Sequence, residues 1–427
     1  MKNLIGGKFV DASNGEKADV INPATNELID TVPLATEEDV DLCVKEAAKA
    51  QKAWAKMPLH ERGDILYKFA DLVEANHEEL AQLLSKETGK PIKEARAEIS
   101  NTKHFIHGYV EKAKHDYGNV IPAGSEVGQE KTMQITVQQP LGVVACIIPF
   151  NFPCDLFGQK VPSALIMGNS VIVKPSTDNP LTLHRYCELL KDAGVPDGVI
   201  NCISGRGSVT GNALAKHPQV ALISVTGSTE VGAEVMANAA ANITHVMLEL
   251  GGNDAFIVMD DADMDLTMKE LVWGRLYNTG QVCCASKRFL VQKGIKDEFI
   301  KRAVETLQSL KVAMPQQEDA DIGCLINEKA AINAEEQVRK TLDQGATLVY
   351  GGRRNGAFFE PTILDNVTKD MDVMKDMEIF APVIPVCTFD TLDEALEIAN
   401  QSKFGLCGNI MTSDMKTAFK AAMEMEV

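Results

Sequence analysis

The sequence predicts an α/β protein with a doubly wound parallel sheet followed by a second α/β region. Four continuous apolar or β-branched runs are typical of strands covered on both faces, and they lie at 143–148, 170–173, 199–203 and 221–225. Helical stretches at 181–193 and 230–241 alternate with these runs, which indicates helices on both faces of one parallel sheet. A fresh strand at 255–259, followed by helices at 263–277 and 295–310, opens the second region.

The part before this sheet divides into three segments. Residues 1–35 combine short apolar runs with glycine and Asn-Pro turns, which predicts short strands. Residues 36–118 are helical in pattern, and the acidic residues after Thr36 suit the start of a helix. Residues 131–140 alternate polar and apolar side chains, which predicts a strand with one buried and one exposed face. Such an edge strand could pair with another subunit.

Composition excludes several classes of protein. A length of 427 residues suggests about three domains, and 45% apolar with 24% charged residues is ordinary for a globular protein. The formal net charge of −18 argues against binding to nucleic acid or to anionic membranes. We find no signal peptide and no apolar run long enough to span a membrane, so we expect a cytoplasmic protein.

The ten cysteines show no metal-binding or disulfide pattern. No C-x-x-C pair is present, and most cysteines lie in apolar runs, which favours buried free thiols in a reducing compartment. His104 and His107 could in principle hold a metal, but a solvated helix face explains them better. We therefore expect no metal site.

Two segments carry groups suited to covalent chemistry. Asn278-Thr-Gly-Gln-Val-Cys283-Cys284-Ala285 presents a cysteine among small and polar residues, and a thiol reacts as its thiolate. Leu248-Glu249-Leu250-Gly251-Gly252-Asn253 places an acid in an apolar run, where burial can turn a carboxylate into a useful base. The alternative for Glu249 is a carboxylate that caps a helix.

Further motifs follow the predicted strands. Pro149-Phe150-Asn151-Phe152-Pro153 holds an asparagine between prolines at a strand end, where ligands bind in α/β sheets, although such an asparagine is often only a turn residue. The turn with Gly227 and Ser228, and another at Gly207, consist of small residues that let backbone amides approach a phosphate. Either turn could equally be an ordinary connection between a strand and a helix.

Together these segments resemble the aldehyde dehydrogenase superfamily over nearly the whole chain. The resemblance implies that NAD(P) accepts a hydride while an aldehyde is oxidised to a carboxylic acid. Cys283 would be the nucleophile, marked by Gly280-Gln281-x-Cys, and Glu249 would activate water. The Asn151 amide would help to form the oxyanion hole, and Lys160 would lie on a proton path, unless it is merely a solvated helix lysine.

The same resemblance implies a set of cofactor contacts. Lys174 would contact the adenosine ribose, and Thr177 stands where relatives that prefer NAD have a glutamate, so we expect NADP to be tolerated or preferred, with help from Arg206. Glu378 would hold the nicotinamide ribose and Phe380 would pack near the ring. The other implied contacts are Pro149, Phe150, Ser176, Gly207, Gly227, Ser228 and Gly251. Ala381 replaces a family glycine and would add a methyl near the cofactor, as in a subset that includes lactaldehyde and phosphonoacetaldehyde dehydrogenases.

The resemblance also implies domains and assembly. Residues 1–118 and 141–252 would form a Rossmann-like NAD(P)-binding domain, 119–140 a small β segment for oligomerisation, and 253–427 the catalytic domain. We expect a homodimer or homotetramer. Relatives usually continue beyond the position of Val427, so we expect the chain to lack a segment that completes the substrate funnel and a strand used in assembly.

Substrate and reaction keep alternatives open. Gln159 stands where succinate-semialdehyde dehydrogenases usually have an arginine, which favours a small or α-substituted aliphatic aldehyde. One alternative is a CoA-acylating enzyme, although that branch usually lacks a glutamate at position 249. Another is a non-catalytic protein that retains the fold.

Overall fold

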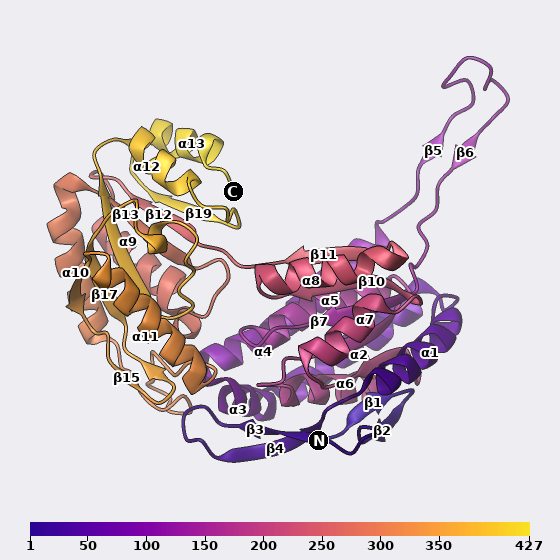
Figure 1. The fold of residues 1–427 in the computed structure, drawn as a ribbon. Helices are drawn as coiled ribbons and strands as arrows, with labels where there is room; N and C mark the ends of the chain where they lie inside the picture. The colour runs from indigo at the N-terminus through magenta and orange to yellow at the C-terminus, as the bar shows by residue number, and fades with distance from the viewer. The chain divides into compact units, whose positions relative to one another are not determined.

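A computed structural model describes residues 1–427 and divides the chain into two compact units. Unit 1 contains residues 1–20, 30–81 and 96–249, and unit 2 contains residues 21–29, 82–95 and 250–427. Each unit is built from strands and helices, as the sequence predicts (Figure 1). The cofactor and catalytic domains that the resemblance implies stay predictions.

Unit 1 is built on a seven-stranded sheet with the strand order β11-β10-β7-β8-β9-β1-β2. Its five parallel strands are β7 (Val143–Ile147), β8 (Ser170–Lys174), β9 (Ile200–Cys202), β10 (Val220–Thr226) and β11 (His245–Glu249). Two antiparallel strands, β1 (Asn3–Ile5) and β2 (Lys8–Val10), extend one edge. The strand order reverses between β7 and β10, and ligands bind at the carboxyl ends of strands beside such a reversal.

Helices cover both faces of this sheet, which confirms the doubly wound arrangement. One face packs against α1 (Glu37–Trp54), α7 (Asn212–Lys216) and α8 (Thr229–Ala239). The other face packs against α5 (Pro153–Ile166) and α6 (Leu181–Ala193), and α2 (Leu59–Ala75) contacts both of these helices (Figure 1). The other early elements are β3 (Lys17–Ile21), β4 (Leu28–Pro33), α3 (His77–Thr88) and α4 (Ile92–Lys114). Strands before residue 36 and helices over 36–118 are therefore confirmed.

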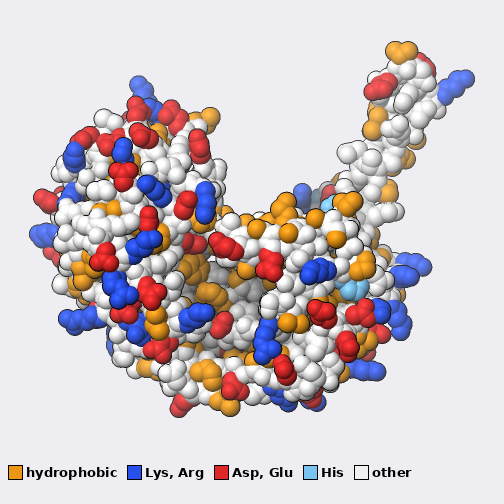
Figure 2. Space-filling view, viewed as in Figure 1, with side chains coloured by type: hydrophobic (Ala, Val, Ile, Leu, Met, Phe, Trp, Pro, Cys, Tyr) orange, Lys and Arg blue, Asp and Glu red, His pale blue; other side chains and the backbone are white.

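Residues 115–140 form an exposed arm of unit 1 with little regular structure (Figure 1). Two short strands pair within it, β5 (Val120–Ile121) and β6 (Gln134–Ile135). The prediction that 131–140 buries one face is wrong for a single chain, because side chains on both faces are exposed, including Ile135 at 61% and Val137 at 69%. Apolar side chains are visible along the arm in Figure 2. Its role in subunit assembly stays a prediction, although exposed apolar surface of this kind is typical of interfaces.

Unit 2 contains a six-stranded sheet with the order β14-β17-β18-β13-β12-β19. Its strands are β12 (Asp254–Val258), β13 (Ser286–Gln292), β14 (Thr347–Tyr350), β17 (Thr362–Val367), β18 (Val383–Phe389) and β19 (Gly408–Met411). Only the β14–β17 pair is antiparallel. A separate hairpin joins β15 (Arg354–Asn355) to β16 (Phe358–Phe359).

Helices also cover both faces of the second sheet. Apolar side chains of α11 (Glu328–Asp343), α12 (Leu392–Asn400) and α13 (Met415–Glu424) form one core, and those of α9 (Met264–Leu271) and α10 (Lys296–Ser309) form another. The second α/β region is thus present as predicted. The helix expected over 263–277 is shorter, because α9 gives way to a π turn, η3 (Val272–Leu276), and a 3-10 turn, η4 (Tyr277–Gly280). No helix of the chain has both the length and the apolar character needed to cross a membrane.

Two side chains satisfy the carboxyl end of α5, the helix that carries Lys160. The Trp54 indole donates a hydrogen bond to the Leu165 carbonyl oxygen, and Arg62 Nε donates to that of Ile166, each at 2.9 Å. The last carbonyl groups of a helix have no partners within the helix, and a cation there suits the helix dipole. Burial lowers the pKa of the Arg62 guanidinium, so this contact holds a charge away from water.

We expect Arg62→Met to lower the free energy of unfolding by about 2 kcal/mol, because it leaves buried carbonyl groups without a donor. The measurement is urea unfolding followed by circular dichroism. Arg302→Met is the control: its side chain is 36% exposed and makes only surface ion pairs, so the free energy of unfolding should stay nearly unchanged. Equal losses in the two variants would contradict this account of α5.

Candidate functional site

The cysteines divide sharply by accessibility. All ten are free thiols and seven are buried; Cys283 and Cys407 are half-buried and Cys284 is exposed. Burial raises the pKa of Cys146 to about 12 and that of Cys387 to about 11, so such thiols are poor nucleophiles at neutral pH. Accessibility therefore favours the 283–284 segment as the place for thiol chemistry.

The loop before Cys283 has an unusual backbone. Asn278, Thr279 and Gly280 follow one another with φ of 51°, 55° and 77°, in the left-handed region that is costly for a β-branched threonine. Glycine is required at 280, because a Cβ atom there would lie 2.5 Å from the carbonyl carbon of Ala381. The surrounding structure must hold these three residues in place for the loop to keep this shape.

Side chains from distant segments hold this loop. Glu94, near the start of α4, accepts the Asn278 N–H through Oε2 at 2.8 Å. Thr279 Oγ1 accepts the Gly323 N–H at 3.2 Å. Gln281 is buried; its Nε2 donates to the Asn278 carbonyl at 3.1 Å and its Oε1 accepts the Ile326 N–H at 2.9 Å. These bonds explain why a glutamine stands two residues before Cys283.

Gly251 and Gly252 have no room for side chains. A Cβ atom on Gly251 would lie 2.6 Å from Glu378 Oε2, and one on Gly252 would lie 2.6 Å from the Cys283 carbonyl oxygen. Real Cβ atoms do not approach other atoms so closely, so a larger residue at 252 would push the Cys283 main chain away, and one at 251 would displace the Glu378 carboxylate. The two glycines thus let the cysteine segment and the Glu378 carboxylate meet.

Lys287 lies where these segments meet. Its Nζ donates to the carbonyl oxygens of Gly252 at 2.8 Å and Cys283 at 2.5 Å, and it lies 3.0 Å from Glu378 Oε1. The same Nζ is 5.5 Å from the centre of the Phe380 ring. The structure therefore brings together four predicted residues of unit 2: Gly251, Cys283, Glu378 and Phe380.

Ala381 is fully buried and belongs to the apolar core of unit 2. Its methyl therefore fills core volume beside Phe380. The expectation that this methyl lies near the cofactor stays a prediction.

In unit 1, the predicted residues cluster at the carboxyl ends of β7, β8 and β10, beside the reversal of strand order. Pro149, Phe150 and Asn151 follow β7, and Asn151 is buried at 5% exposure. Asn179 Nδ2 donates to the Phe150 carbonyl oxygen at 2.9 Å, which fixes this turn. Pro153 then starts α5 at its first position, where proline suits a helix.

Lys174 ends β8 with a buried ammonium group. Its Nζ donates to the neighbouring Pro175 carbonyl oxygen at 3.2 Å, and burial lowers its pKa to about 8. One acceptor leaves donors of the ammonium group unused, which is costly for a buried cation. Ser176 and Thr177 follow, both half-buried. The arrangement suits a ligand that brings oxygen acceptors.

The two glycine turns also lie at strand ends. Gly227 follows β10, and its N–H donates to the Glu249 carbonyl oxygen at 3.0 Å. Ser228 is the N-cap of α8, and its Oγ accepts the Val231 N–H at 3.3 Å. Gly207 starts the π turn η1 (Gly207–Gly211) and lies in open space. Thr226 Oγ1, beside Gly227, is buried without a hydrogen-bond partner.

Glu249 is less buried than its apolar neighbours in the sequence suggest. β11 is an edge strand with one neighbour, so Met247 is 59% exposed and Glu249 is half-buried. The apolar run thus belongs to an exposed edge and not to a covered strand. Glu249 is the last residue of unit 1, and Leu250 begins the last segment of unit 2.

Lys160 and Glu249 line the same cavity of about 590 Å³ in unit 1, together with Gln159 and Ser224. Lys160 Nζ donates to Ser224 Oγ at 2.9 Å. Burial lowers the pKa of the Lys160 ammonium, while Cys146 and Glu249 raise it. Ser224 and Glu249 come from neighbouring strands, since Ser224 pairs with Met247 and Thr226 with Glu249. A lysine, a hydroxyl and an acid therefore share one water-accessible space.

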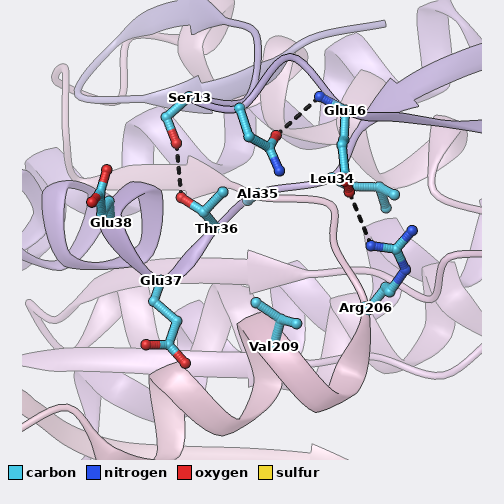
Figure 3. A pocket seen from close by; sticks show the side chains of 10 residues that line it. Ser13, Glu16, Leu34, Ala35, Thr36, Glu37, Glu38, Arg206 and Val209 are labelled. Carbon is cyan, nitrogen blue, oxygen red and sulfur yellow. Dashed lines mark hydrogen bonds and ion pairs between the residues drawn. The ribbon is translucent and has the colours of Figure 1, made fainter.

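A second pocket of unit 1, of about 600 Å³, has different chemistry (Figure 3). Arg206 lines it, but its guanidinium pairs with Glu16 at 3.0 Å. Glu37 and Glu38 at the start of α1 add two more carboxylates. With three acids and one paired cation, this pocket is a poor site for a phosphorylated ligand.

Sequence reasoning missed three polar side chains near the predicted residues: Lys287, Ser224 and Asp254. Lys287 stands beside Arg288 at the start of a buried strand, and two cations in such a position are a signal. Ser224 has no sequence signal, because a serine within a strand is ordinary. Burial raises the pKa of Asp254 to about 7, and its Oδ2 is buried without a partner.

The sequence of this chain matches a known protein family and characterised relatives. The family described as "Aldehyde dehydrogenase family" matches residues 9–427. The chain is 38% identical to D-glyceraldehyde dehydrogenase (NADP(+)) of Picrophilus torridus, over 99% of this chain and 86% of that protein. It is 37% identical to mitochondrial succinate-semialdehyde dehydrogenase of Oryza sativa, over 100% of this chain and 80% of that protein.

A solved structure shares the fold. A point mutant of betaine aldehyde dehydrogenase from Staphylococcus aureus, in complex with NAD+, superposes with a TM-score of 0.96 at 34% identity, over 100% of this chain and 88% of that one. The sequence match and the structural match therefore both extend over nearly the whole chain. The chain belongs to the aldehyde dehydrogenase family, whose members are oxidoreductases that act on aldehydes.

Proposed function

We propose that this protein oxidises an aldehyde to a carboxylic acid with NAD or NADP, through a covalent intermediate on Cys283. The observation that carries the proposal is an accessible thiol, held by a left-handed loop, in a member of this family. A covalent intermediate divides one difficult step into two easier ones.

In this mechanism the Cys283 thiolate attacks the aldehyde carbon, and the carbonyl oxygen becomes an oxyanion. The Asn151 amide and the Cys283 backbone N–H donate hydrogen bonds to that oxyanion, and such donors are each worth a few kcal/mol in the transition state. When bound, NAD or NADP supplies the hydride acceptor. The thioester left on Cys283 then reacts with a water from which Glu249 takes a proton, which releases the acid and restores the thiolate.

Lys174 supports the binding of a phosphorylated dinucleotide. Its buried ammonium group has one acceptor, so it can donate to ribose or phosphate oxygens. Thr177, three residues on, adds no negative charge that would repel a 2′-phosphate. Gly207 has no atom within 4 Å of the place where a Cβ atom would stand, which leaves room for the rest of the ligand. We propose that NADP is accepted and preferred.

Lys160 is proposed to take the proton from Glu249 toward solvent. The shared cavity supports this role, because its water-sized space adjoins both side chains. The lowered pKa of Lys160 eases proton exchange, since burial favours the neutral amine. Ser224 would hold the amine in place through its hydroxyl oxygen.

We propose a small or α-substituted aliphatic aldehyde as substrate. Gln159 lines the cavity with a neutral amide, which cannot form an ion pair with a second carboxylate at the far end of a substrate. The similarity to a D-glyceraldehyde dehydrogenase supports the same class. The similarity to succinate-semialdehyde dehydrogenase keeps a dicarboxylic semialdehyde as the second candidate. CoA as the acyl acceptor is disfavoured by Glu249, and an assay with and without CoA separates the two reactions.

We expect the wild-type protein to reduce NADP with glyceraldehyde or lactaldehyde in an absorbance assay that also includes succinate semialdehyde and NAD. Cys283→Ala should lower this turnover by about a thousandfold or more, because it removes the nucleophile. Cys284→Ala is the matched control and should remain active. Retained turnover in Cys283→Ala would refute the proposal. Inactivity of the wild type toward every aldehyde, with slow labelling of Cys283 by a thiol reagent, would favour a non-catalytic protein.

Glu249→Gln should separate the two half-reactions. We expect the pre-steady-state burst of reduced cofactor to persist while the steady-state rate falls by about a hundredfold, because only hydrolysis needs the base. Stopped-flow absorbance measures both rates in one experiment. An equal loss of burst and steady-state rates would rule out a role confined to hydrolysis.

Thr177→Glu should shift cofactor preference toward NAD. A carboxylate there would repel a 2′-phosphate and pair with a ribose hydroxyl, so we expect the ratio of kcat/KM for NADP over NAD to fall by about tenfold or more. Asp178→Glu is a control, since residue 178 is exposed and already acidic. An unchanged ratio in Thr177→Glu would show that the ribose lies elsewhere.

A further inference from the structure

Lys287 is an unusually buried lysine. It lies at the start of β13, and its side chain is 1% exposed. Its ammonium group has three N–H donors and three acceptors: the carbonyl oxygens of Gly252 and Cys283, and Glu378 Oε1. Every donor is therefore used, and each acceptor belongs to a different segment of unit 2.

Burying this cation has a cost that the contacts offset. Burial lowers the pKa of the Lys287 ammonium, while Glu378 raises it. Lysine is almost never fully buried unless it is paired. An apolar side chain would fill the same space without that cost, so packing alone does not explain a lysine here. The contacts themselves indicate why this residue is charged.

The three acceptors belong to segments that the proposed reaction requires in fixed positions relative to one another. The Cys283 carbonyl belongs to the nucleophile, and a bond to it restricts rotation of the peptide group that follows the reactive residue. Gly252 packs closely against the Cys283 carbonyl oxygen. Glu378 is the carboxylate proposed to hold the nicotinamide ribose, and it also accepts the Gly252 N–H at 3.4 Å. One cation therefore joins the nucleophile to the group that faces the cofactor.

We propose that Lys287 is a positioning residue that couples the cofactor-facing carboxylate of Glu378 to the nucleophile Cys283. This role rests on the proposed function, because Lys287 can couple Glu378 to Cys283 only if Glu378 binds the cofactor and Cys283 is the nucleophile. A bound dinucleotide that contacts Glu378 changes the ion pair between Glu378 and Lys287. Lys287 in turn changes the position of the Cys283 thiol through its hydrogen bond to the Cys283 carbonyl oxygen.

The alternative is a lysine that only stabilises the core of unit 2. Both roles predict lower stability when the side chain is replaced. They differ in the response of Cys283 to cofactor: positioning requires NADP to change thiol reactivity through Lys287, whereas a purely structural lysine leaves that response intact in any folded variant.

The experiment compares Lys287→Met and Lys287→Gln with Lys293→Met. Lys293 is 60% exposed and pairs with Asp390 at the surface, so it controls for loss of a lysine in the same unit. Lys287→Gln keeps a hydrogen-bond donor without the charge. The rate of iodoacetamide alkylation at Cys283, followed by peptide mass spectrometry with and without NADP, is the main readout. Thermal unfolding and steady-state kinetics accompany it.

We expect Lys287→Met to lower kcat by about tenfold or more, to slow alkylation, and to abolish the change in alkylation rate that NADP causes in the wild type. Lys287→Gln should be intermediate, and Lys293→Met should match the wild type. Glu378→Gln should lower kcat in the wild type but add little in Lys287→Met, because the two changes remove one shared contact.

Two results would overturn the proposal: a folded Lys287→Met variant in which NADP still changes alkylation as in the wild type, or losses that multiply fully with Glu378→Gln. If Lys287→Met does not fold, the same comparison in Lys287→Gln decides. Failure of the proposed function looks different: the wild type oxidises no aldehyde, yet alkylation of Cys283 still depends on Lys287.

Discussion

The absence of side chains at Gly251 and Gly252 is the constraint on which the site in unit 2 depends. The Glu378 carboxylate and the Cys283 carbonyl oxygen lie only 2.6 Å from where Cβ atoms of residues 251 and 252 would stand, so both groups pack directly against this main chain. That packing brings the Cys283 and Gly252 carbonyl groups and the Glu378 carboxylate within reach of one ammonium group. A methyl group at either glycine would separate these parts by more than their hydrogen bonds tolerate.

In unit 1 the order of the strands determines where the predicted site residues lie. Because the order reverses between β7 and β10, the segments after these strands diverge and leave their main-chain groups accessible at one edge. Asn151 and Gly227 follow the strands β7 and β10, and Lys174 is the last residue of β8. The Lys174 ammonium and Thr226 Oγ1 keep unused hydrogen-bonding capacity in this part of unit 1.

Much of this was predictable from the sequence, and the exceptions have physical reasons. Strands covered on both faces leave continuous apolar runs, so β7, β8 and β10 were found within a residue or two. Local patterns do not reveal which strand lies at an edge, so Glu249 was expected to be more buried than it is. Contacts between distant residues also leave no local trace: Glu94 and Asn278 lie 184 positions apart, and Lys160 and Ser224 lie 64 apart. The burial of Ala381 in the core was not predicted, because a motif fixes a position in the chain and not the packing around a methyl group.

The central claim is that an acyl group passes through Cys283, and rapid quenching during turnover tests it most directly. The protein is mixed with NADP and an aldehyde that it oxidises, quenched in acid, digested and analysed by mass spectrometry. The account predicts a transient acyl adduct on the peptide that contains Cys283, and that this adduct accumulates in Glu249→Gln. An adduct on a different residue, or formation of the acid with no adduct at any time, would contradict it.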